Sequence, residues 1–315
     1  MVDWGVKTGP GGYSFEDLKS IWLEAEKLGF NSGWLYDHIY SLNAKDQINL
    51  ECWTTLSALA SLTNRLKVGT MVLCNQFRHP SLLAKMGATL DLISNGRLEF
   101  GIGAGWYDEE AKECGIDFPD TKTRILRLRE AVQVIRMLWT SEKASFSGDY
   151  YTLNEAICNP KPIQKPHPPI WIGTPRGMKL MPRVVAEVAD VVNYSFRSPE
   201  ECKERIDVLR VACQKVGRPL DKIRLSLQCR ILIAEDERRL KERIESLARK
   251  AGKDAATYVK EQESEAALIG PPSRVIEGLR RYMDLGIDYF VIVFLGDTTL
   301  EPLRIFAESV MPKFQ

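Results

Sequence analysis

The amino-acid sequence predicts an α/β fold of the TIM type, a (β/α)8 barrel, and three observations support that fold class. Short apolar runs alternate with amphipathic helical runs about eight times, the number of units that this barrel requires. Strands connected through helices must run parallel, and the apolar run Val291–Phe294 suits a strand buried on both faces. The length of 315 residues fits one such barrel. An open doubly wound sheet would show similar alternation, so the unit count and the motifs below decide between the two.

The first unit illustrates how the elements are recognised. Val2–Lys7 is an expected strand, and the helix Ser14–Leu28 follows it. Ser14 is the expected N-cap, Asp17 completes a capping box, and Gly29 ends the helix. The other expected strands are Ser32–Tyr36, Lys67–Leu73, Leu98–Ile102, Pro169–Ile172, Asp190–Tyr194, Ile223–Ile233 and Tyr289–Phe294. The other expected helices are Cys52–Leu62, 80–94, Thr121–Thr140, 178–187, Pro199–Val216, Ser273–Leu285 and Leu300–Val310.

Two insertions interrupt this alternation within what we expect to be one domain spanning 1–315. The first, at about 143–168, holds an expected hairpin over Phe146–Leu153 and continues into a proline-rich surface connection. The second, at about 235–270, is highly charged but keeps helical periodicity, so we expect a helical insertion with a solvated face. Such an insertion can also form a lid over the mouth of a barrel.

Composition excludes several classes of protein. The 43 basic and 42 acidic residues give a net charge of +1, so no nucleic acid or membrane partner is expected. The chain has no apolar run long enough for a transmembrane helix and no signal-like start. Its seven cysteines form no C-x-x-C pair, and its three histidines are not clustered. We therefore expect a cytoplasmic protein with reduced thiols and no metal site.

The chemistry of a barrel of this kind is carried by the residues that follow each strand, because the active site lies at the carboxyl ends of the strands. His38 follows the second expected strand and is a candidate acid/base or cofactor ligand, which Asp37 could orient; a structural His–Asp pair is the alternative. The glycines of Gly101–Trp106 allow a ligand to approach the backbone, although a tight turn has the same composition. Gly173-Thr174-Pro175-Arg176-Gly177 leads into a helix, which favours phosphate binding over an ordinary turn.

Other polar residues receive no catalytic role. We expect the consecutive carboxylates Asp108-Glu109-Glu110 to be solvated, because adjacent residues on a helix point in different directions. His79 precedes Pro80 at a helix start and is expected to cap or pack. The sequence contains neither a G-x-S-x-G nucleophile motif nor an H-E-x-x-H zinc motif.

Taken together in their order and spacing, these motifs resemble the luciferase-like family, especially its F420-dependent reductases and dehydrogenases. The resemblance covers nearly the whole chain. The matching segments are Tyr36-Asp37-His38, Gly69–Leu73, Gly101–Trp106 with Asp108–Glu110, Phe146–Tyr151, Pro168–Gly173 and Gly270–Tyr289.

The resemblance implies roles for individual residues. His38 would contact the deazaflavin ring or act as acid/base, Asp37 would bond the polar edge of the ring, and a non-prolyl cis peptide at Met71–Val72 would form a bulge behind it. The implied catalytic residues are His38 and Asp37. The implied cofactor-binding residues are Asp37, Met71, Val72, Cys74, Gly103, Ala104, Gly105, Gly173, Thr174 and Arg176.

The implied function is an F420-dependent oxidoreductase that moves a hydride between the deazaflavin and a small organic substrate, and the resemblance also implies a homodimer. The alternatives are an FMN-dependent monooxygenase and a flavin-binding barrel without turnover. The sugar-phosphate dehydrogenases of the family carry a proton-donating glutamate where this chain has Trp106, and a tryptophan that Ser41–Asp46 lacks. Their substrate is therefore not expected here.

Overall fold

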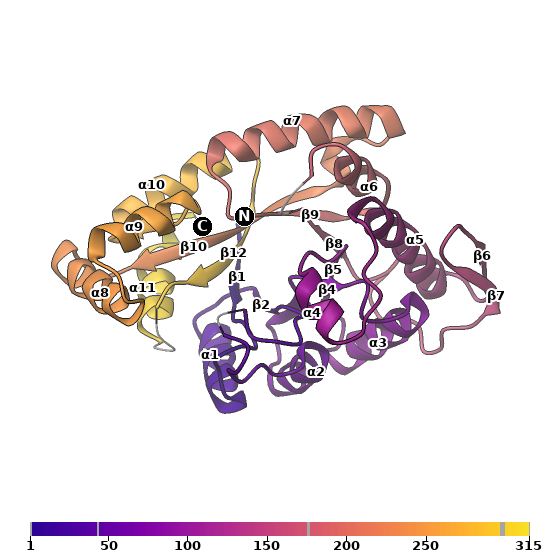
Figure 1. Ribbon diagram of the computed structural model, residues 1–315, viewed down its shortest axis with the longest axis horizontal. Helices are drawn as coiled ribbons and strands as arrows, with labels where there is room; N and C mark the ends of the chain where they lie inside the picture. Colours follow the sequence, from indigo (N-terminus) through magenta and orange to yellow (C-terminus); the bar gives the residue numbers. More distant parts are fainter. Residues whose placement is uncertain (1, 43, 175–176, 297–299, 315) are drawn as a thin grey trace.

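The expected (β/α)8 barrel is confirmed by a computed structural model that describes residues 2–42, 44–174, 177–296 and 300–314. Within these ranges eight parallel strand positions close into a ring surrounded by helices (Figure 1). The pairings of β1 with β12 and of β9 with β10 complete the closure. The barrel strands are β1 (Asp3–Lys7), β2 (Ser32–Leu35), β3 (Lys67–Thr70) with β4 (Leu73–Cys74), β5 (Leu98–Gly103), β8 (Ile170–Gly173), β9 (Val191–Ser195), β10 (Arg224–Ile233) and β12 (Tyr289–Phe294).

The helices of the outer ring begin and end close to the expected positions. Ser14 caps α1 in a full capping box with Asp17, as predicted. The helices are α1 (Phe15–Lys27), α2 (Cys52–Leu62), α3 (Pro80–Ile93), α4 (Asp108–Glu113), α5 (Thr121–Thr140), α6 (Leu180–Val188), α7 (Pro199–Val216), α10 (Pro272–Met283) and α11 (Glu301–Ser309), with short 3-10 helices η1 (Leu220–Lys222) and η2 (Met311–Phe314). No helix in the described ranges has the length and apolar character needed to cross a membrane.

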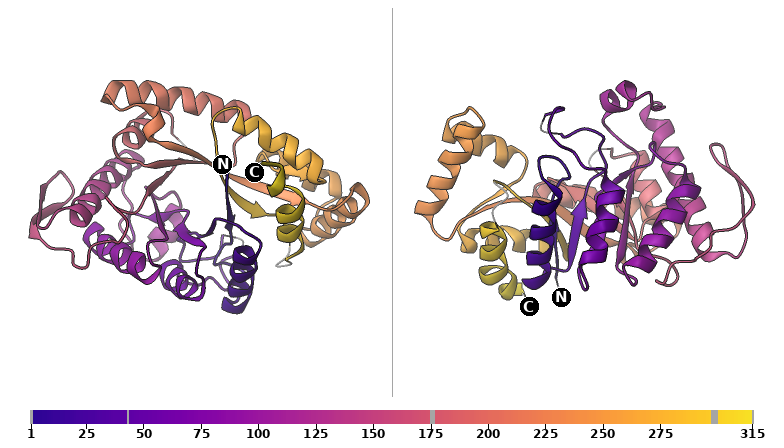
Figure 2. Two further views of the ribbon diagram at one scale, coloured as in Figure 1. Left: turned by 180° about the vertical axis from the view of Figure 1, so that it is seen from behind. Right: turned by 90° about the horizontal axis from the view of Figure 1, so that it is seen from below.

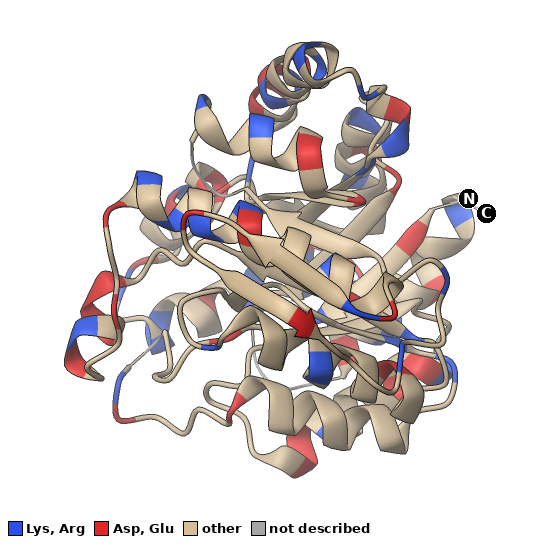
Figure 3. Ribbon diagram, turned by 90° about the vertical axis from the view of Figure 1, so that its right-hand side faces the viewer, with Lys and Arg blue, Asp and Glu red and all other residues tan. Residues whose placement is uncertain are grey.

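Both insertions stand away from the ring of strands. The hairpin of β6 (Ala144–Ser147) and β7 (Thr152–Ala156) projects at one side, and α8 (Glu237–Lys250) with α9 (Ala255–Ser264) lies at the other (Figure 1). After α9 the chain adds β11 (Leu268–Gly270), a strand that periodicity did not predict, because it is short and pairs with β10 beyond the barrel. Charges of both signs are interspersed along the helices (Figure 3).

The third strand differs from its expected form. We predicted one strand over Lys67–Leu73, but β3 ends at Thr70 and β4 resumes at Leu73. A cis peptide bond joins Met71 to Val72 between them, where the family resemblance placed it. The hydroxyl of Thr70 donates to the carbonyl of Gly101 at 2.7 Å, which ties the broken strand to β5.

Aromatic side chains fill the amino-terminal part of the barrel. The rings of Trp34 and Trp171 lie 4.6 Å apart, and Tyr289 lies 4.7 Å from Trp171, with all three side chains buried. The ends of the described chain lie side by side at this end of the molecule, and the loops that follow the strands lie at the opposite end (Figure 2). Because the floor is packed, a ligand must enter from the rim formed by those loops.

Candidate active site

His38 lies on the rim, in the loop after β2, and a buried carboxylate contacts it. Its Nδ1 lies 2.9 Å from Oε2 of Glu110 on α4. The side chains of His38 and Glu110 are 11% and 1% exposed, so solvent screens this contact little. The pair joins two rim loops that are 72 residues apart in the sequence.

The other oxygen of Glu110 accepts two backbone hydrogen bonds from the same loop, from the N–H groups of Ile39 and Tyr40. Burial alone would raise the pKa of Glu110, but the hydrogen bonds from His38 and these two N–H groups outweigh it and lower the pKa. The carboxylate is therefore ionised near neutral pH and can only accept. Nδ1 of His38 must then carry a hydrogen, so that in the neutral form of the ring Nε2 is the free nitrogen.

The expectation that all three consecutive carboxylates are solvated is wrong for Glu110. Asp108 and Glu109 do lie at the surface, where they pair with Lys112 and Lys45. Glu110 faces inward because α4 is a short helix laid across the rim, and its third residue points toward the β2 loop. In the sequence, the apolar Ala111 next to Glu110 indicates a buried side of this helix, and Ala111 is buried in the structure.

Asp37 has a different set of partners from the one proposed. Its carboxylate holds Arg78 in a two-point ion pair, with N–O distances of 2.7 and 3.1 Å, and accepts the backbone N–H of Cys74 at 3.0 Å. Among the described residues, no hydrogen bond joins Asp37 to His38, so the hypothesis that Asp37 orients the imidazole is wrong. Arg78 also pairs with Glu51, and these contacts fasten the β2 loop to the β4 loop. Arg78 is not among the site residues predicted from the sequence.

A pocket of about 280 Å³ opens beside His38. Asn49 lines it and donates through its side-chain nitrogen to the backbone carbonyl of His38, while its Oδ1 is buried without a partner. A buried acceptor without a partner is costly, so this oxygen indicates a site for a ligand donor. The remaining lining residues are Asp37, Ile39, Glu51, Phe77, Arg78 and Ile116.

Val72 lies between two of the glycines expected to contact a cofactor. A Cβ added at Gly103 would lie 2.7 Å from Cγ2 of Val72, and one added at Gly173 would lie 3.2 Å from its Cγ1. Gly105 has a φ of +77°, and a Cβ there would lie 2.9 Å from the sulfur of Cys74. Packing against Val72 therefore favours glycine at 103 and 173, and Gly105 is required for its backbone conformation as well. Met71 points into the barrel, where it packs in a buried cluster with Trp34.

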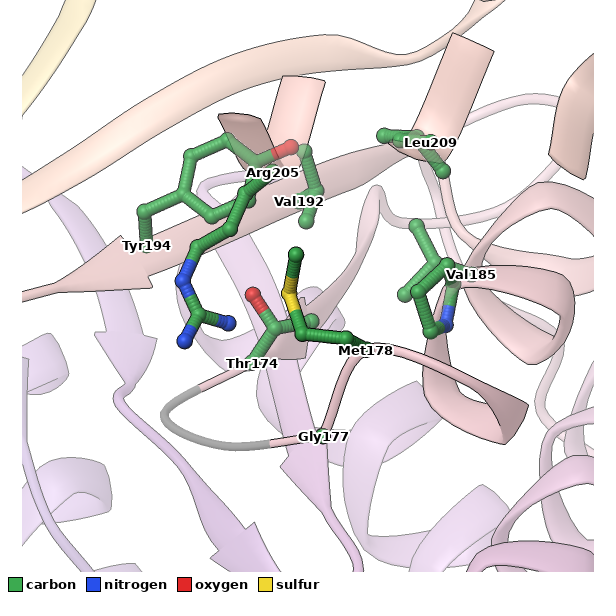
Figure 4. A pocket seen from close by; sticks show the side chains of 9 residues that line it. Thr174, Gly177, Met178, Val185, Val192, Tyr194, Arg205 and Leu209 are labelled. Carbon is green, nitrogen blue, oxygen red and sulfur yellow. The ribbon is translucent and has the colours of Figure 1, made fainter. Parts of the chain in front are cut away.

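The turn after β8 borders a second, smaller pocket of about 20 Å³ between β9, α6 and α7 (Figure 4). The Thr174 hydroxyl lines it, but its hydrogen is donated to the carbonyl of Asn193 at 3.1 Å. Arg205 on α7 points toward Thr174 (Figure 4), and burial lowers the pKa of its guanidinium, assisted by the nearby charge of Arg197. The expected phosphate ligand Arg176 lies outside the described residues.

Trp106 follows the glycine-rich turn after β5 and forms an aromatic edge to the site. Its ring stacks on Tyr107 with centroids 5.3 Å apart and meets the His38 ring edge-on at 5.6 Å. The side chain is 53% exposed. It can shield one side of the imidazole but offers no proton to a substrate. In the described part of the chain, no cluster of three His, Cys, Asp or Glu side chains is placed to hold a metal ion.

The chain is similar to known proteins in both sequence and fold. A family model described as luciferase-like monooxygenase matches residues 2–289. The F420-dependent glucose-6-phosphate dehydrogenase of Amycolatopsis mediterranei (strain U-32) is 25% identical, and the alignment covers 100% of this chain and 99% of the relative.

Two solved structures share the fold. An F420-dependent secondary alcohol dehydrogenase in complex with an F420–acetone adduct superposes with a TM-score of 0.84 at 22% identity, covering 100% of this chain and 99% of the other. The oxygenating constituent of 3,6-diketocamphane monooxygenase from Pseudomonas putida, in complex with FMN, gives a TM-score of 0.77 at 19% identity, again with 100% and 99% coverage.

Proposed function

The chain belongs to the luciferase-like monooxygenase family, and on that basis we propose that it is an F420-dependent oxidoreductase acting on a small organic substrate. The observation that carries the proposal is the His38–Glu110 pair, which presents one free imidazole nitrogen at the rim. Full-length relatives at 25–27% identity named as F420-dependent dehydrogenases support the choice of cofactor.

The rim has features that suit a bound deazaflavin. Gly103 leaves the backbone without a side chain beside Val72, Gly105 does the same beside Cys74, and the buried Oδ1 of Asn49 can accept a hydrogen bond. When bound, the deazaflavin would supply the centre that accepts or donates the hydride. The residues proposed to hold it are Asp37, Met71, Val72, Cys74, Gly103, Ala104, Gly105, Gly173, Thr174 and Arg176. The Asp37 side chain would act there mainly by fixing Arg78 and the β4 loop.

His38 would handle the proton that accompanies the hydride. An alcohol that loses a hydride from carbon must also lose its hydroxyl proton, and Nε2 of the neutral imidazole can accept it. Glu110 would stabilise the imidazolium that forms and keep the ring oriented through Nδ1. In the opposite direction the imidazolium would return the proton to a carbonyl oxygen. Trp106 would restrict access of water to one side of the ring.

Glucose 6-phosphate is not the proposed substrate. The dehydrogenases named for that sugar resemble this chain over its whole length, but the resemblance places their proton-donating glutamate at the position of Trp106. An indole cannot donate a proton in acid/base catalysis. The proton function would therefore rest on His38 alone.

A competition experiment tests the cofactor. The purified protein is incubated with equal concentrations of F420 and FMN, and the retained molecule is identified by its absorbance spectrum and mass. We expect F420 to be retained by both the wild type and His38→Ala. Retention of FMN with substrate-dependent oxygen consumption would support the monooxygenase function instead. A monooxygenase component with the same fold binds FMN. Retention of F420 without any redox change across a panel of alcohols and ketones would support a carrier.

We also propose that the protein is a cytoplasmic homodimer. All seven cysteines are free thiols, which is typical of a reducing compartment. Large apolar side chains are exposed on α2 and α3, namely Leu62, Leu82, Leu92 and Ile93, and such exposure favours self-association. Light scattering after size-exclusion chromatography measures the mass. An Ile93→Asp variant should shift it to that of the monomer, and a monomeric wild type would refute the dimer.

A further inference from the structure

Lys7, the last residue of β1, places its ammonium group in the mouth of the barrel. Side chains alternate along a strand, and Trp4 and Val6 pack outward in the core beneath the helices, so Lys7 points inward. Its Nζ lies 3.2 Å from Oε1 of Gln228 on β10 and 5.5 Å from the centre of the Tyr36 ring.

The ammonium has only neutral partners. Within the described ranges, no carboxylate lies within ion-pair distance of Lys7, and its contacts are an amide oxygen and an aromatic face. Arg78, another cation on the rim, is paired with the carboxylates of Asp37 and Glu51. Lys7 therefore differs from Arg78, because no described carboxylate is paired with it.

A second cation lies nearby at the same level of the barrel. In the pairing of β10 with β12, Arg230 lies opposite Val293. In the pairing of β1 with β12, Val6 lies opposite Ile292, so the next residue, Lys7, lies on the other side of Val293 from Arg230. Arg230 lies over the Phe196 ring at 4.4 Å and forms an ion pair with Glu265. Of these two cationic side chains, Arg230 has a carboxylate partner and Lys7 has none among the described residues.

The surroundings of Lys7 destabilise the protonated form of its amine. Burial, and next the charge of Arg230, lower the pKa of Lys7 to about 7. A charged group that is buried without a counter-ion loses its hydration without compensation. A bound anion would replace that hydration and favour the protonated form. A neutral ligand would not.

The position of Tyr36 connects this cation to the proposed reaction centre. One face of the ring meets Lys7, and the ring lies edge-on to His38 with centroids 5.5 Å apart. Only one aromatic ring thus separates the ammonium from the imidazole.

We propose that Lys7 binds an anionic oxygen group, a carboxylate or a phosphate, of the substrate on which His38 acts. The substrate would then be a small organic anion, such as a hydroxy acid or its keto form, with its charged end at Lys7 and its reacting carbon toward His38. This inference rests on the proposed function for the identity of the reacting end. The anion site itself depends only on the residues described above.

Binding to the F420-loaded protein tests the proposal. Lactate and inorganic phosphate serve as anionic probes and propan-2-ol as the neutral match, at constant ionic strength, with affinities measured by calorimetry. We expect at least one anion to bind and propan-2-ol to bind at least about tenfold more weakly. Lys7→Gln should weaken anion binding by about tenfold or more, and Lys7→Arg should keep it within about threefold. The matched control is Lys241→Gln, at an 80% exposed position on α8, which should bind as the wild type does.

A second readout does not require a variant that folds. Because the pKa of Lys7 is about 7, about half of its amine is unprotonated and nucleophilic at neutral pH, and mass spectrometry can follow its acylation in the wild type. A bound anion should slow acylation of Lys7 and leave Lys241 unaffected. Which anion protects better distinguishes a carboxylate substrate from a phosphate one.

Three outcomes would overturn the proposal. The first is that neither anion binds, and the second is that binding is unchanged in folded Lys7→Gln. The third is that an anion bound to the cofactor-free protein is lost when F420 is added, which would assign the site to the cofactor. Retention of F420 is measured separately by absorbance. If F420 is not retained but the anion still binds at Lys7, the proposed function fails while the anion site stands.

Discussion

Nδ1 of His38 donates to Oε2 of Glu110 at 2.9 Å, and this one contact fixes both the tautomer and the direction of the imidazole. The relationship resembles the carboxylate–histidine pairs that orient general bases elsewhere, although here the carboxylate also holds two backbone N–H groups of the loop that carries His38. Glu110 thus positions both the loop and the side chain.

Replacing Glu110 with Gln should lower turnover at least roughly 10- to 100-fold, the loss seen when a partner that orients a metal-bound histidine is removed. The carboxylate uses one oxygen to accept from His38 and the other to accept from Ile39 and Tyr40, whereas the amide has a single acceptor oxygen. Its NH2 group would therefore face one of these two sets of N–H donors. Steady-state kinetics and F420 titration would measure the effect. We expect kcat to fall with little change in cofactor affinity.

The matched control is Glu109→Gln, because Glu109 precedes Glu110 on the same helix but is 56% exposed and paired only with surface groups. This variant should keep wild-type turnover. Equal losses in both variants would mean that α4 as a whole, and not the contact with His38, supports activity.

The stability of Glu110→Gln relative to the wild type should depend on pH. The pKa of Glu110 in the folded protein lies below its ordinary value of 4.5, so its contribution is present above that value and is lost as the pH falls toward the lowered one. The difference in free energy of unfolding between wild type and Glu110→Gln should be constant above about pH 5 and shrink below it. Urea unfolding at several pH values measures this. A difference that grows on acidification would show that Glu110 is protonated in the folded state.

Removing the imidazole should abolish most turnover without affecting the cofactor. General acid/base groups contribute roughly 10²- to 10⁴-fold, so His38→Ala should lose a factor in that range. Cofactor titration and a substrate assay on the same preparation separate the two effects. Full activity in a folded His38→Ala protein, on a substrate that the wild type converts, would remove His38 from the mechanism.

Asp37 should contribute to stability more than its place in the proposed site implies. Asp37→Asn leaves the 15% exposed Arg78 without its two-point partner, and breaking a buried pair costs about 3 kcal/mol or more. Chemical unfolding measures the loss. The double variant with Arg78→Met should recover part of it, because the carboxylate that then lacks Arg78, that of Glu51, is 49% exposed to solvent. An additive double variant would mean that the two side chains do not interact.

Alanine substitutions at three glycines should form a graded series. A Cβ at Gly101 would lie 1.8 Å from the backbone oxygen of Thr70, so Gly101→Ala should prevent folding. Gly103→Ala should cost about 1–3 kcal/mol, because Val72 must shift, and Gly173→Ala should cost less. Thermal unfolding and F420 affinity are the two measurements. Equal stability at positions 103 and 173 would contradict the role assigned to Val72.

Much of the fold was predictable, because strand and helix periods are local properties of the chain. The helix Cys52–Leu62 and the strand Tyr289–Phe294 end where the pattern ends. The break in the third strand left no trace in periodicity, since Met71 and Val72 are as apolar as a buried strand requires. Only the family resemblance located it.

The site was less predictable, because its contacts join distant loops. His38 was identifiable from its place after a strand, but its carboxylate partner depends on how α4 crosses the rim. Asp37 seemed the natural partner because it is adjacent, yet neighbouring residues point apart, and its side chain reaches Arg78 instead. Lys7 ends a strand as His38 follows one, but a charged residue at a strand end is also the ordinary way for a strand to meet solvent.

The position of Val72 between Gly103 and Gly173 couples three segments of the wall in a way that matters for engineering. A side chain added at either glycine would occupy space that the Val72 side chain now fills, so the total side-chain volume at the three positions is limited. A library that randomises residue 103 alone would consist mostly of inactive clones. Varying it together with residue 72, for example as Val72→Ala with Gly103→Ala, would let the chamber change shape while its walls stay in contact.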